Sequence, residues 1–168
     1  WLVHGTEECL SVQTIPAGAR QVFELDLLVS EAFPIMDILD PGETLNFKSG
    51  AYVQIDVPEF EASFSEFKVG DTYREAWDSF NLWTLKAKAD KPAFRAYSMA
   101  NHPAEGNIVM LNIRIATPPW DVSQGRFKNV NPGVCSSYIF SLKPGDKVTV
   151  SGPYGEFFIK DTKNEMVY

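Results

Sequence analysis

The chain has 168 residues, of which 45% are hydrophobic and 22% charged, and its formal net charge is -7. This length is sufficient for one domain with a sizeable core. The negative charge argues against nucleic-acid binding, because nucleic-acid binders carry clustered Lys and Arg. No apolar run approaches the roughly twenty residues that a membrane helix needs. The two cysteines and two histidines lack metal-ligand spacing, so we expect no intrinsic metal site.

Short strands separated by turn residues account for most of the chain. The clearest is 52–57, where Val53, Ile55 and Val57 alternate with more polar residues, as expected of a half-buried strand. One helix is expected at 135–142. The other expected strands are 9–14, 21–29, 94–100, 108–116 and 147–151, with turns at Pro41 and Gly42 and at 152–155. These elements predict an all-β fold, a small closed antiparallel barrel with one helix.

Residues 58–92 are rich in acidic and aromatic side chains and differ from the flanking strands. A helix is expected to begin near Asp71 and Thr72, which can accept hydrogen bonds from free backbone N–H groups, with Glu75 in its first turn. An aromatic stripe follows at helical spacing. We expect this stripe to pack the insertion onto the barrel; a partner-docking surface is the alternative. The stripe consists of Trp77, Phe80 and Trp83.

Two arginines occupy similar places on successive expected strands. Side chains two apart on a strand share a face, so Arg95 and Tyr97 lie opposite Phe94 and Ala96, which we expect in the barrel interior. Two arginines on one outer face of an acidic chain predict an anionic ligand, whereas ordinary ion pairing with surface carboxylates is the alternative. The next strand repeats the arrangement, with Asn112 and Arg114 outward and Leu111, Ile113 and Ile115 inward.

A glycine turn leads into the expected helix. Gly133 lets the backbone approach a ligand closely, and the helix after it directs free N–H groups at that ligand. Ser136 and Ser137 can add hydroxyl donors, although a plain N-cap is the alternative. Cys135 stands at the helix start, where a thiol gains reactivity; a small residue filling a tight loop is the alternative interpretation.

The strand segment 95–98 and the helix start at 133–137 together suit a flavin dinucleotide. Arg95 matches phosphate charge, Tyr97 can stack on the ring, and Ser98 can hydrogen-bond to it. The backbone N–H groups after Gly133 suit a pyrophosphate.

Several motifs, in this order, resemble the FAD-binding barrel of the ferredoxin reductase family. Longer strings resemble the F subunits of bacterial sodium-translocating NADH:quinone reductases. The shorter motifs are at 95–98, 133–137 and 151–155, and the longer strings are at 73–83, 94–101, 111–119 and 155–158.

The resemblance implies a six-stranded antiparallel Greek-key β-barrel with one capping α-helix and a helical insertion. It implies an FAD-binding domain over 1–165, with the insertion at 58–92, and the start of a C-terminal NADH-binding domain at 166–168. We therefore expect the chain to be an excised piece of a longer polypeptide. FAD would be bound in this chain, and NADH and a [2Fe–2S] cluster in domains outside it. The flavin would take a hydride from NADH and pass single electrons to the cluster, driving sodium transport and quinone reduction in the full complex.

The resemblance also implies residue roles. Arg95 would lie at the phosphates, Tyr97 on the isoalloxazine and Ser98 near its reactive nitrogen, which makes Ser98 and Tyr97 the expected catalytic residues. No metal ligand is implied in this chain. The expected cofactor-binding residues are Arg95, Ala96, Tyr97, Ser98, Asn112, Ile113, Arg114, Ile115, Gly133, Val134, Cys135, Ser136 and Ser137.

The implied partners are other subunits of a membrane respiratory complex, on the cytoplasmic side of the bacterial inner membrane, with no nucleic acid. This piece would not itself span the membrane. One alternative is a soluble flavin or ferredoxin-type reductase with another acceptor, against which the insertion at 58–92 argues. The other is a cofactor-free barrel that serves as an interaction module.

Overall fold

Strands predominate in the structure, as the sequence predicts. The strand expected at 9–14 and the turn expected at Pro41 and Gly42 lie outside the described residues. The computed structural model describes residues 20–24, 27–30, 33–37, 45–106, 108–143, 146–156, 158 and 163.

A four-stranded antiparallel sheet forms the base of the molecule, in the order β1-β11-β4-β7. Its central strand β4 confirms the predicted alternation, because Val53, Ile55 and Val57 are buried while the residues between them are only partly so. Val148 and Val150 of β11 are buried on the same side, also as predicted. The strands are β1 (Arg20–Glu24), β4 (Tyr52–Val57), β7 (Ala93–Ser98) and β11 (Lys147–Tyr154).

A three-stranded antiparallel sheet, β2-β3-β8, lies beside it. It consists of β2 (Leu27–Ser30), β3 (Phe33–Asp37) and β8 (Ile108–Met110). A bridge between Met99 and Leu111 links the two sheets, and the Ala100 N–H donates to the Met110 carbonyl at 2.6 Å.

This arrangement differs from the predicted elements in several places, and one of them is β11, which continues through residues 152–154 where a turn is expected. The strand expected at 21–29 is divided, because β1 pairs with β11 and β2 pairs with β3 in another sheet. The strand expected at 108–116 ends at Met110, and β3 is not predicted from the sequence. The described strands therefore form separate sheets, and no single closed six-stranded barrel is seen among them.

Residues 58–92 form a subdomain between β4 and β7. Strands β5 (Phe60–Ser63) and β6 (Lys86–Ala89) pair antiparallel and carry the helical elements between them. These are η1 (Phe64–Glu66), α1 (Asp71–Ser79) and η2 (Leu82–Thr84). The subdomain has its own buried cluster, which consists of Ala62, Phe64, Phe67, Trp77, Leu82 and Ala87.

The expected cap of α1 is wrong. The helix begins after Gly70, so Asp71 is its first helical residue and no side chain caps it. Asp71 instead pairs with Arg74 at 3.2 Å, and Glu75 lies beyond the first turn. A carboxylate in the first turn still interacts favourably with the helix dipole, which accounts for an acidic start without a side-chain cap.

The aromatic stripe packs mostly within the insertion. Trp77 is buried, and its ring centroid lies 4.7 Å from that of Trp83. Phe80 follows the last helical residue, remains 48% exposed and meets Trp120 at 5.3 Å. Contact with the rest of the molecule comes from Phe140 and neighbouring side chains against this cluster.

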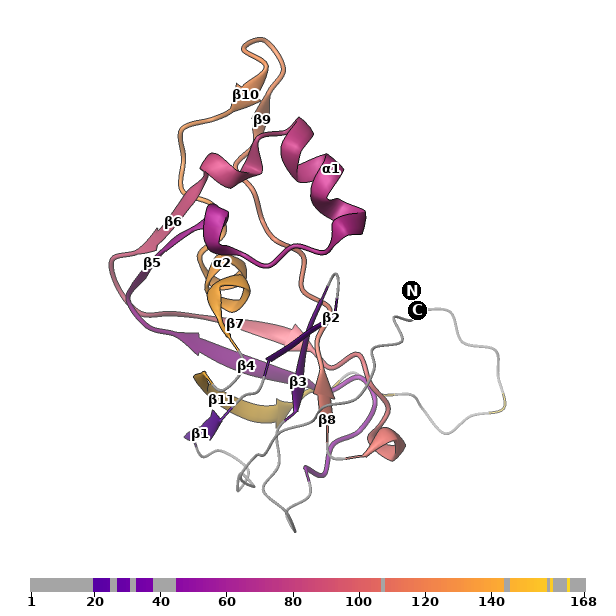
Figure 1. The fold of residues 1–168 in the computed structure, drawn as a ribbon. Helices are drawn as coiled ribbons and strands as arrows, with labels where there is room; N and C mark the ends of the chain where they lie inside the picture. The colour runs from indigo at the N-terminus through magenta and orange to yellow at the C-terminus, as the bar shows by residue number, and fades with distance from the viewer. Residues whose placement is uncertain are drawn as a thin grey trace.

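A hairpin and a short helix are also not predicted. The segment expected as a polar connection contains a hairpin of β9 (Trp120–Asp121) and β10 (Arg126–Phe127), which projects beside α1 (Figure 1). A short helix, η3 (Pro103–Glu105), follows His102, whose exposed imidazole accepts a hydrogen bond from the Ala104 N–H at 3.1 Å.

Helix α2 (Val134–Ser141) confirms the helix predicted at 135–142, displaced by one residue. It lies between the insertion and the four-stranded sheet (Figure 1). Ile139 and Cys135 are buried in the main core with the strand valines, while Phe140 packs on the insertion cluster. Within the part of the chain that the structure describes, no helix has the length and apolar character needed to cross a membrane.

Replacing Trp77 by alanine should destabilise the chain by about 3–5 kcal/mol, because it leaves a cavity between Phe64, Phe67 and Trp83. Tyr73→Ala, on the same helix but 42% exposed, is the matched control and should cost less than about 1 kcal/mol. Urea unfolding followed by far-ultraviolet circular dichroism measures both. Equal losses for the two variants would contradict a separate insertion core.

Candidate functional site

Strand β7 presents the expected site residues on the edge of the four-stranded sheet. Directly opposed residues of an antiparallel pair share a face, and Arg95 and Tyr97 oppose Ile55 and Val53 of β4. The Ile55 and Val53 side chains are buried, so Arg95 and Tyr97 lie on the face of the sheet that carries the core. Arg95 nonetheless remains exposed, since β7 is an edge strand.

The expectation that Phe94 and Ala96 face the barrel interior is therefore wrong. Both are exposed, Phe94 by 55%, and they share the outer face with Ser98. The physical reason is that Tyr97 has a large apolar ring, which packs against the core from the same face as Arg95. The hydrophobicity of Phe94 and Ala96 alone therefore assigns the wrong face of β7 to the core.

The two arginines are exposed. The Arg95 Nη1 donates to the Phe94 carbonyl at 2.7 Å. Among the residues that the structure describes, neither Arg95 nor Arg114 takes part in a salt bridge. Ordinary ion pairing, the alternative explanation for these residues, is thus not what the described part of the chain shows.

Tyr97 of β7 and Cys135 of α2 both pack in the main core where these two elements are in contact, and the charge of Arg95 acts on both groups. Burial raises the pKa of Tyr97 to about 12; the nearby Cys135 adds to this rise, and Arg95 opposes it. Burial also raises the pKa of the Cys135 thiol, again opposed by Arg95. Cys135 is 5% exposed. Its thiol is therefore held protonated, which is the opposite of the activated state that a helix N-terminus can produce.

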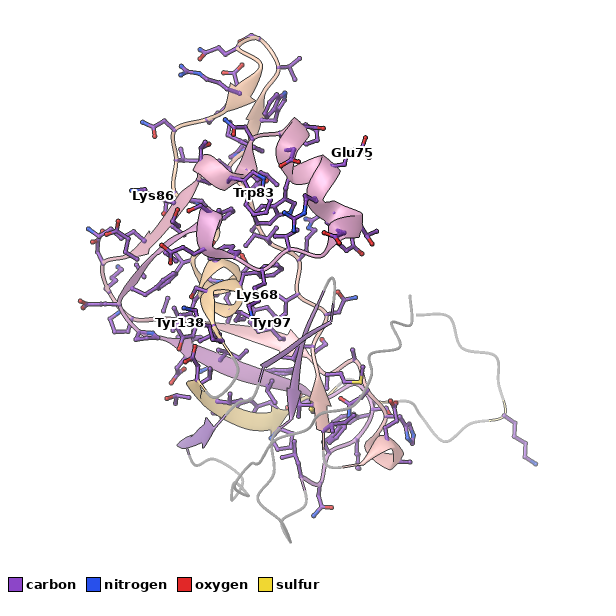
Figure 2. All side chains as sticks on the ribbon, in the orientation of Figure 1. Lys68, Glu75, Trp83, Lys86, Tyr97 and Tyr138 are labelled. Atoms are coloured by element: carbon purple, nitrogen blue, oxygen red, sulfur yellow. The ribbon has the colours of Figure 1, made fainter. Side chains whose placement is uncertain are left out.

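Figure 2 shows Tyr97 and Tyr138 between α2 and the four-stranded sheet, at opposite ends of this junction. Tyr138 is not predicted as a site residue. Its ring lies 5.4 Å from that of Phe60, and burial, followed by the charge of Asp146, raises its pKa. Both phenols are therefore protonated near neutral pH and able to donate hydrogen bonds.

The sequence predicts that the backbone at Gly133 approaches a ligand closely. In the structure Gly133 lies close to Ala116 of the same chain. Its N–H donates to the Ala116 carbonyl at 2.7 Å, and a Cβ at Gly133 would lie 2.5 Å from the Ala116 Cβ. The Ser136 hydroxyl accepts from the Ala116 N–H and donates to the Gly133 carbonyl, both at 3.1 Å. The two bonds of Ala116, from the Gly133 N–H and to the Ser136 hydroxyl, clamp the end of the 112–116 segment to the start of α2, and the bond from Ser136 to the Gly133 carbonyl lies within that helix start.

The start of α2 offers backbone donors. Gly133 is its N-cap and no side chain caps the helix, while the Ser137 N–H closes the first turn on the Gly133 carbonyl at 3.0 Å. Ser137 is fully buried and its hydroxyl has no hydrogen-bond partner among the described residues. With the Ser136 hydroxyl engaged internally, an anion at this helix end would be bound by backbone N–H groups, including that of Val134.

The segment 112–116 follows β8 without regular strand structure. Asn112 and Arg114 are exposed, Ile113 is buried, and Ile115 packs against the insertion cluster. The predicted inward and outward alternation is confirmed. Because Ile113 is in the core, only its backbone is available to a ligand.

Asn131 is a further residue that the sequence reasoning missed. Its carboxamide accepts from the Lys88 N–H at 3.0 Å and donates to the Lys88 carbonyl at 2.8 Å. The signal available in the sequence is weak: an Asn-Pro-Gly run, ending at Gly133, which indicates only a turn.

Comparison with known proteins first indicates the class of FAD-binding oxidoreductase domains. Residues 81–159 match the family model described as an oxidoreductase FAD-binding domain. The structure is similar to the crystal structure of the cytochrome b5 reductase domain of Ulva prolifera nitrate reductase. The TM-score is 0.52, over 86% of this chain and 43% of that one. At 16% identity this likeness shows the fold alone, which is ferredoxin reductase-like as the motifs predict.

Two curated relatives make the similarity more specific, and both are F subunits of a Na(+)-translocating NADH-quinone reductase. The chain is 55% identical over 166 residues to the F subunit of Methylococcus capsulatus, covering 99% of this chain and 39% of the relative. It is 52% identical over 127 residues to the F subunit of Neisseria meningitidis, covering 76% of this chain and 30% of the relative. The resemblance to F subunits is thus confirmed, and the chain spans less than half the length of either relative.

Gly133→Ala should destabilise the start of α2, because the new Cβ would overlap the Ala116 Cβ although the backbone angle at Gly133 suits alanine. Overpacking of this kind typically costs about 1–3 kcal/mol. Adding Ala116→Gly removes the opposing atom and should restore part of the stability. A double-mutant cycle from urea unfolding measures the coupling, and additive losses would contradict a direct contact.

The raised pKa of Tyr97 predicts a loss of stability in alkali. Between pH 10 and about 12 the unfolded chain releases this proton while the folded chain retains it, so stability falls as pH rises through that window. Tyr97→Phe removes this contribution and should reduce the steepness of the fall. Unfolding free energies at about pH 9 and about pH 11 test this; identical falls in both proteins would contradict the buried phenol.

Proposed function

We propose that this chain binds FAD, as the flavin-binding part of an F subunit of a sodium-translocating NADH:quinone reductase. The observation that carries the proposal is the junction of β7 and α2. There an exposed Arg95 outside any described salt bridge, the half-buried ring of Tyr97 and a helix start without a side-chain cap come together in an acidic chain. This combination suits a ligand that joins an aromatic ring to phosphates.

The residues present fit such a cofactor. Arg95 would pair with the phosphates, the backbone N–H groups after Gly133 would bind the pyrophosphate, and Tyr97 would pack against the flavin ring. When bound, FAD supplies hydride acceptance and one-electron release, which no protein side chain provides. Ser98 is exposed on the other face of β7 from Tyr97, so we place it at the rim, where its hydroxyl can donate to the ring edge.

Residues 112–116 would form a second cofactor-binding segment. Asn112 and Arg114 would contact the flavin and ribityl region, together with the backbone of Ile113 and Ile115. Support comes from the clamp that joins Ala116 to the start of α2, since this clamp keeps the two segments at one end of the helix.

A closed six-stranded Greek-key barrel is part of this proposal. Strands β1 and β2 are separated by two residues and pair with β11 and β3, so one bent strand would join the two sheets. The Met99 and Leu111 bridge would complete the ring on the other side. With β1 and β2 counted as one strand, the six strands of this barrel would be β1–β2, β11, β4, β7, β8 and β3.

The activity of the whole protein is also a proposal, because the chain spans 39% and 30% of the length of the two relatives. We propose that NADH and a [2Fe–2S] cluster bind to parts outside this chain. In this proposal other subunits of the complex are its partners, at the cytoplasmic side of the bacterial inner membrane. A flavin reductase with another acceptor is less favoured, because the 99% alignment includes the insertion, whereas the general family model begins at residue 81.

Titration of the purified chain with FAD, followed by quenching of flavin fluorescence, tests the proposal. Arg95→Ala should weaken binding by about 1.5–3 kcal/mol, the scale of a hydrogen bond to a charged group. Arg126→Ala, on the β9–β10 hairpin, removes the same charge and should leave affinity unchanged. A wild-type chain that neither binds FAD nor is stabilised by it against heat would instead favour a cofactor-free interaction module.

A further inference from the structure

The insertion contacts α2 at several points along its length. Phe60 of β5 meets Tyr138 edge-on at 5.4 Å, and Phe67 meets Phe140 at 6.2 Å. Strand β6 also lies against this helix. The insertion therefore supports the helix that follows Gly133, although the insertion is remote from that residue in sequence.

Asn131 extends this support to the helix start. Its carboxamide makes two hydrogen bonds to one residue of β6, accepting from the Lys88 N–H at 3.0 Å and donating to the Lys88 carbonyl at 2.8 Å. This is the pairing that a neighbouring strand would make, here supplied by a side chain. It fastens the loop before α2 to the insertion.

Only Pro132 separates Asn131 from Gly133. Pro132 is buried and its ring restricts the backbone, so the link between the two is short and stiff. On its other side Gly133 is hydrogen-bonded to Ala116 at 2.7 Å. The helix start is thus held from two directions, by the insertion through Asn131 and by the 112–116 segment through Ala116.

We infer that Asn131 is a positioning residue for the phosphate end of the cofactor site, through which the insertion sets the place of the first backbone N–H groups of α2. This inference rests on the proposed FAD binding. It assigns a function to the insertion itself, which is to orient the pyrophosphate donors through Asn131. A displacement of about 1 Å in such groups is sufficient to weaken their interactions strongly.

The test compares FAD with riboflavin, which has the same ring and neither phosphate. Asn131→Asp keeps the shape and the acceptor of the side chain but replaces its N–H donor by a negatively charged oxygen, whereas Asn131→Ala loses both hydrogen bonds and adds no charge. Both variants should bind FAD about tenfold more weakly and riboflavin within about twofold of wild type. Asn129→Ala, two residues earlier and exposed, is the matched control and should bind both flavins as wild type does.

The outcomes separate the two proposals. Unchanged FAD affinity in both Asn131 variants, or an equal loss for FAD and riboflavin, overturns the positioning role and leaves FAD binding intact. A wild-type chain that binds no FAD overturns both. Selective loss of FAD affinity in both variants supports the inference. Asn131→Ala adds no charge that could repel the phosphates, and a general loss of stability would weaken the binding of both flavins alike.

Discussion

The packing of α2 between two hydrophobic clusters is the constraint on which the rest of the structure depends. Ile139 and Cys135 belong to the core of the four-stranded sheet, and Phe140 packs on the core of the insertion. Burial of a side chain such as Ile139 contributes about 1.5–3 kcal/mol. Apolar packing on both sides fixes the helix axis, and with it the position of Gly133 and the backbone donors that follow.

The edge position of β7 keeps the Arg95 guanidinium exposed although this residue lies on the core face of the sheet. Opposite Arg95 stands Ile55, which is fully buried, yet the guanidinium remains exposed because β7 is an edge strand among the described strands of this sheet. Charged side chains at sheet edges also oppose unwanted strand pairing. The same residue thus lies beside the apolar ring of Tyr97 and within reach of an external anion, a combination that a central strand would not allow.

The insertion at 58–92 supports the elements around it as well as forming its own core. It has its own core around Trp77, and its outer contacts go to α2, to the hairpin through Phe80 and to the loop before Gly133 through Asn131. The contacts to α2 and to the loop before Gly133 make the helix start depend on residues far away in sequence. This dependence is consistent with the similarity to the F subunit of Methylococcus capsulatus, which extends over 99% of the chain and includes the insertion.

Local patterns determined a good part of the fold. The alternation around Ile55, the valines of β11 and the helix after Gly133 are set by periodicity and turn chemistry within a few residues, so the sequence alone predicted them. It also predicted that Arg95 and Tyr97 share a face. Motif order pointed to the family before any contact was known.

Only the tertiary structure decided which face of β7 belongs to the core, where the strand at 21–29 divides, and that Asn131 pairs with Lys88. A period of two shows which side chains lie together but not which side is covered, since that depends on the register with a distant strand. The hydrogen bonds of Asn131 likewise join residues 43 apart in the chain, and no local pattern specifies a partner at that separation.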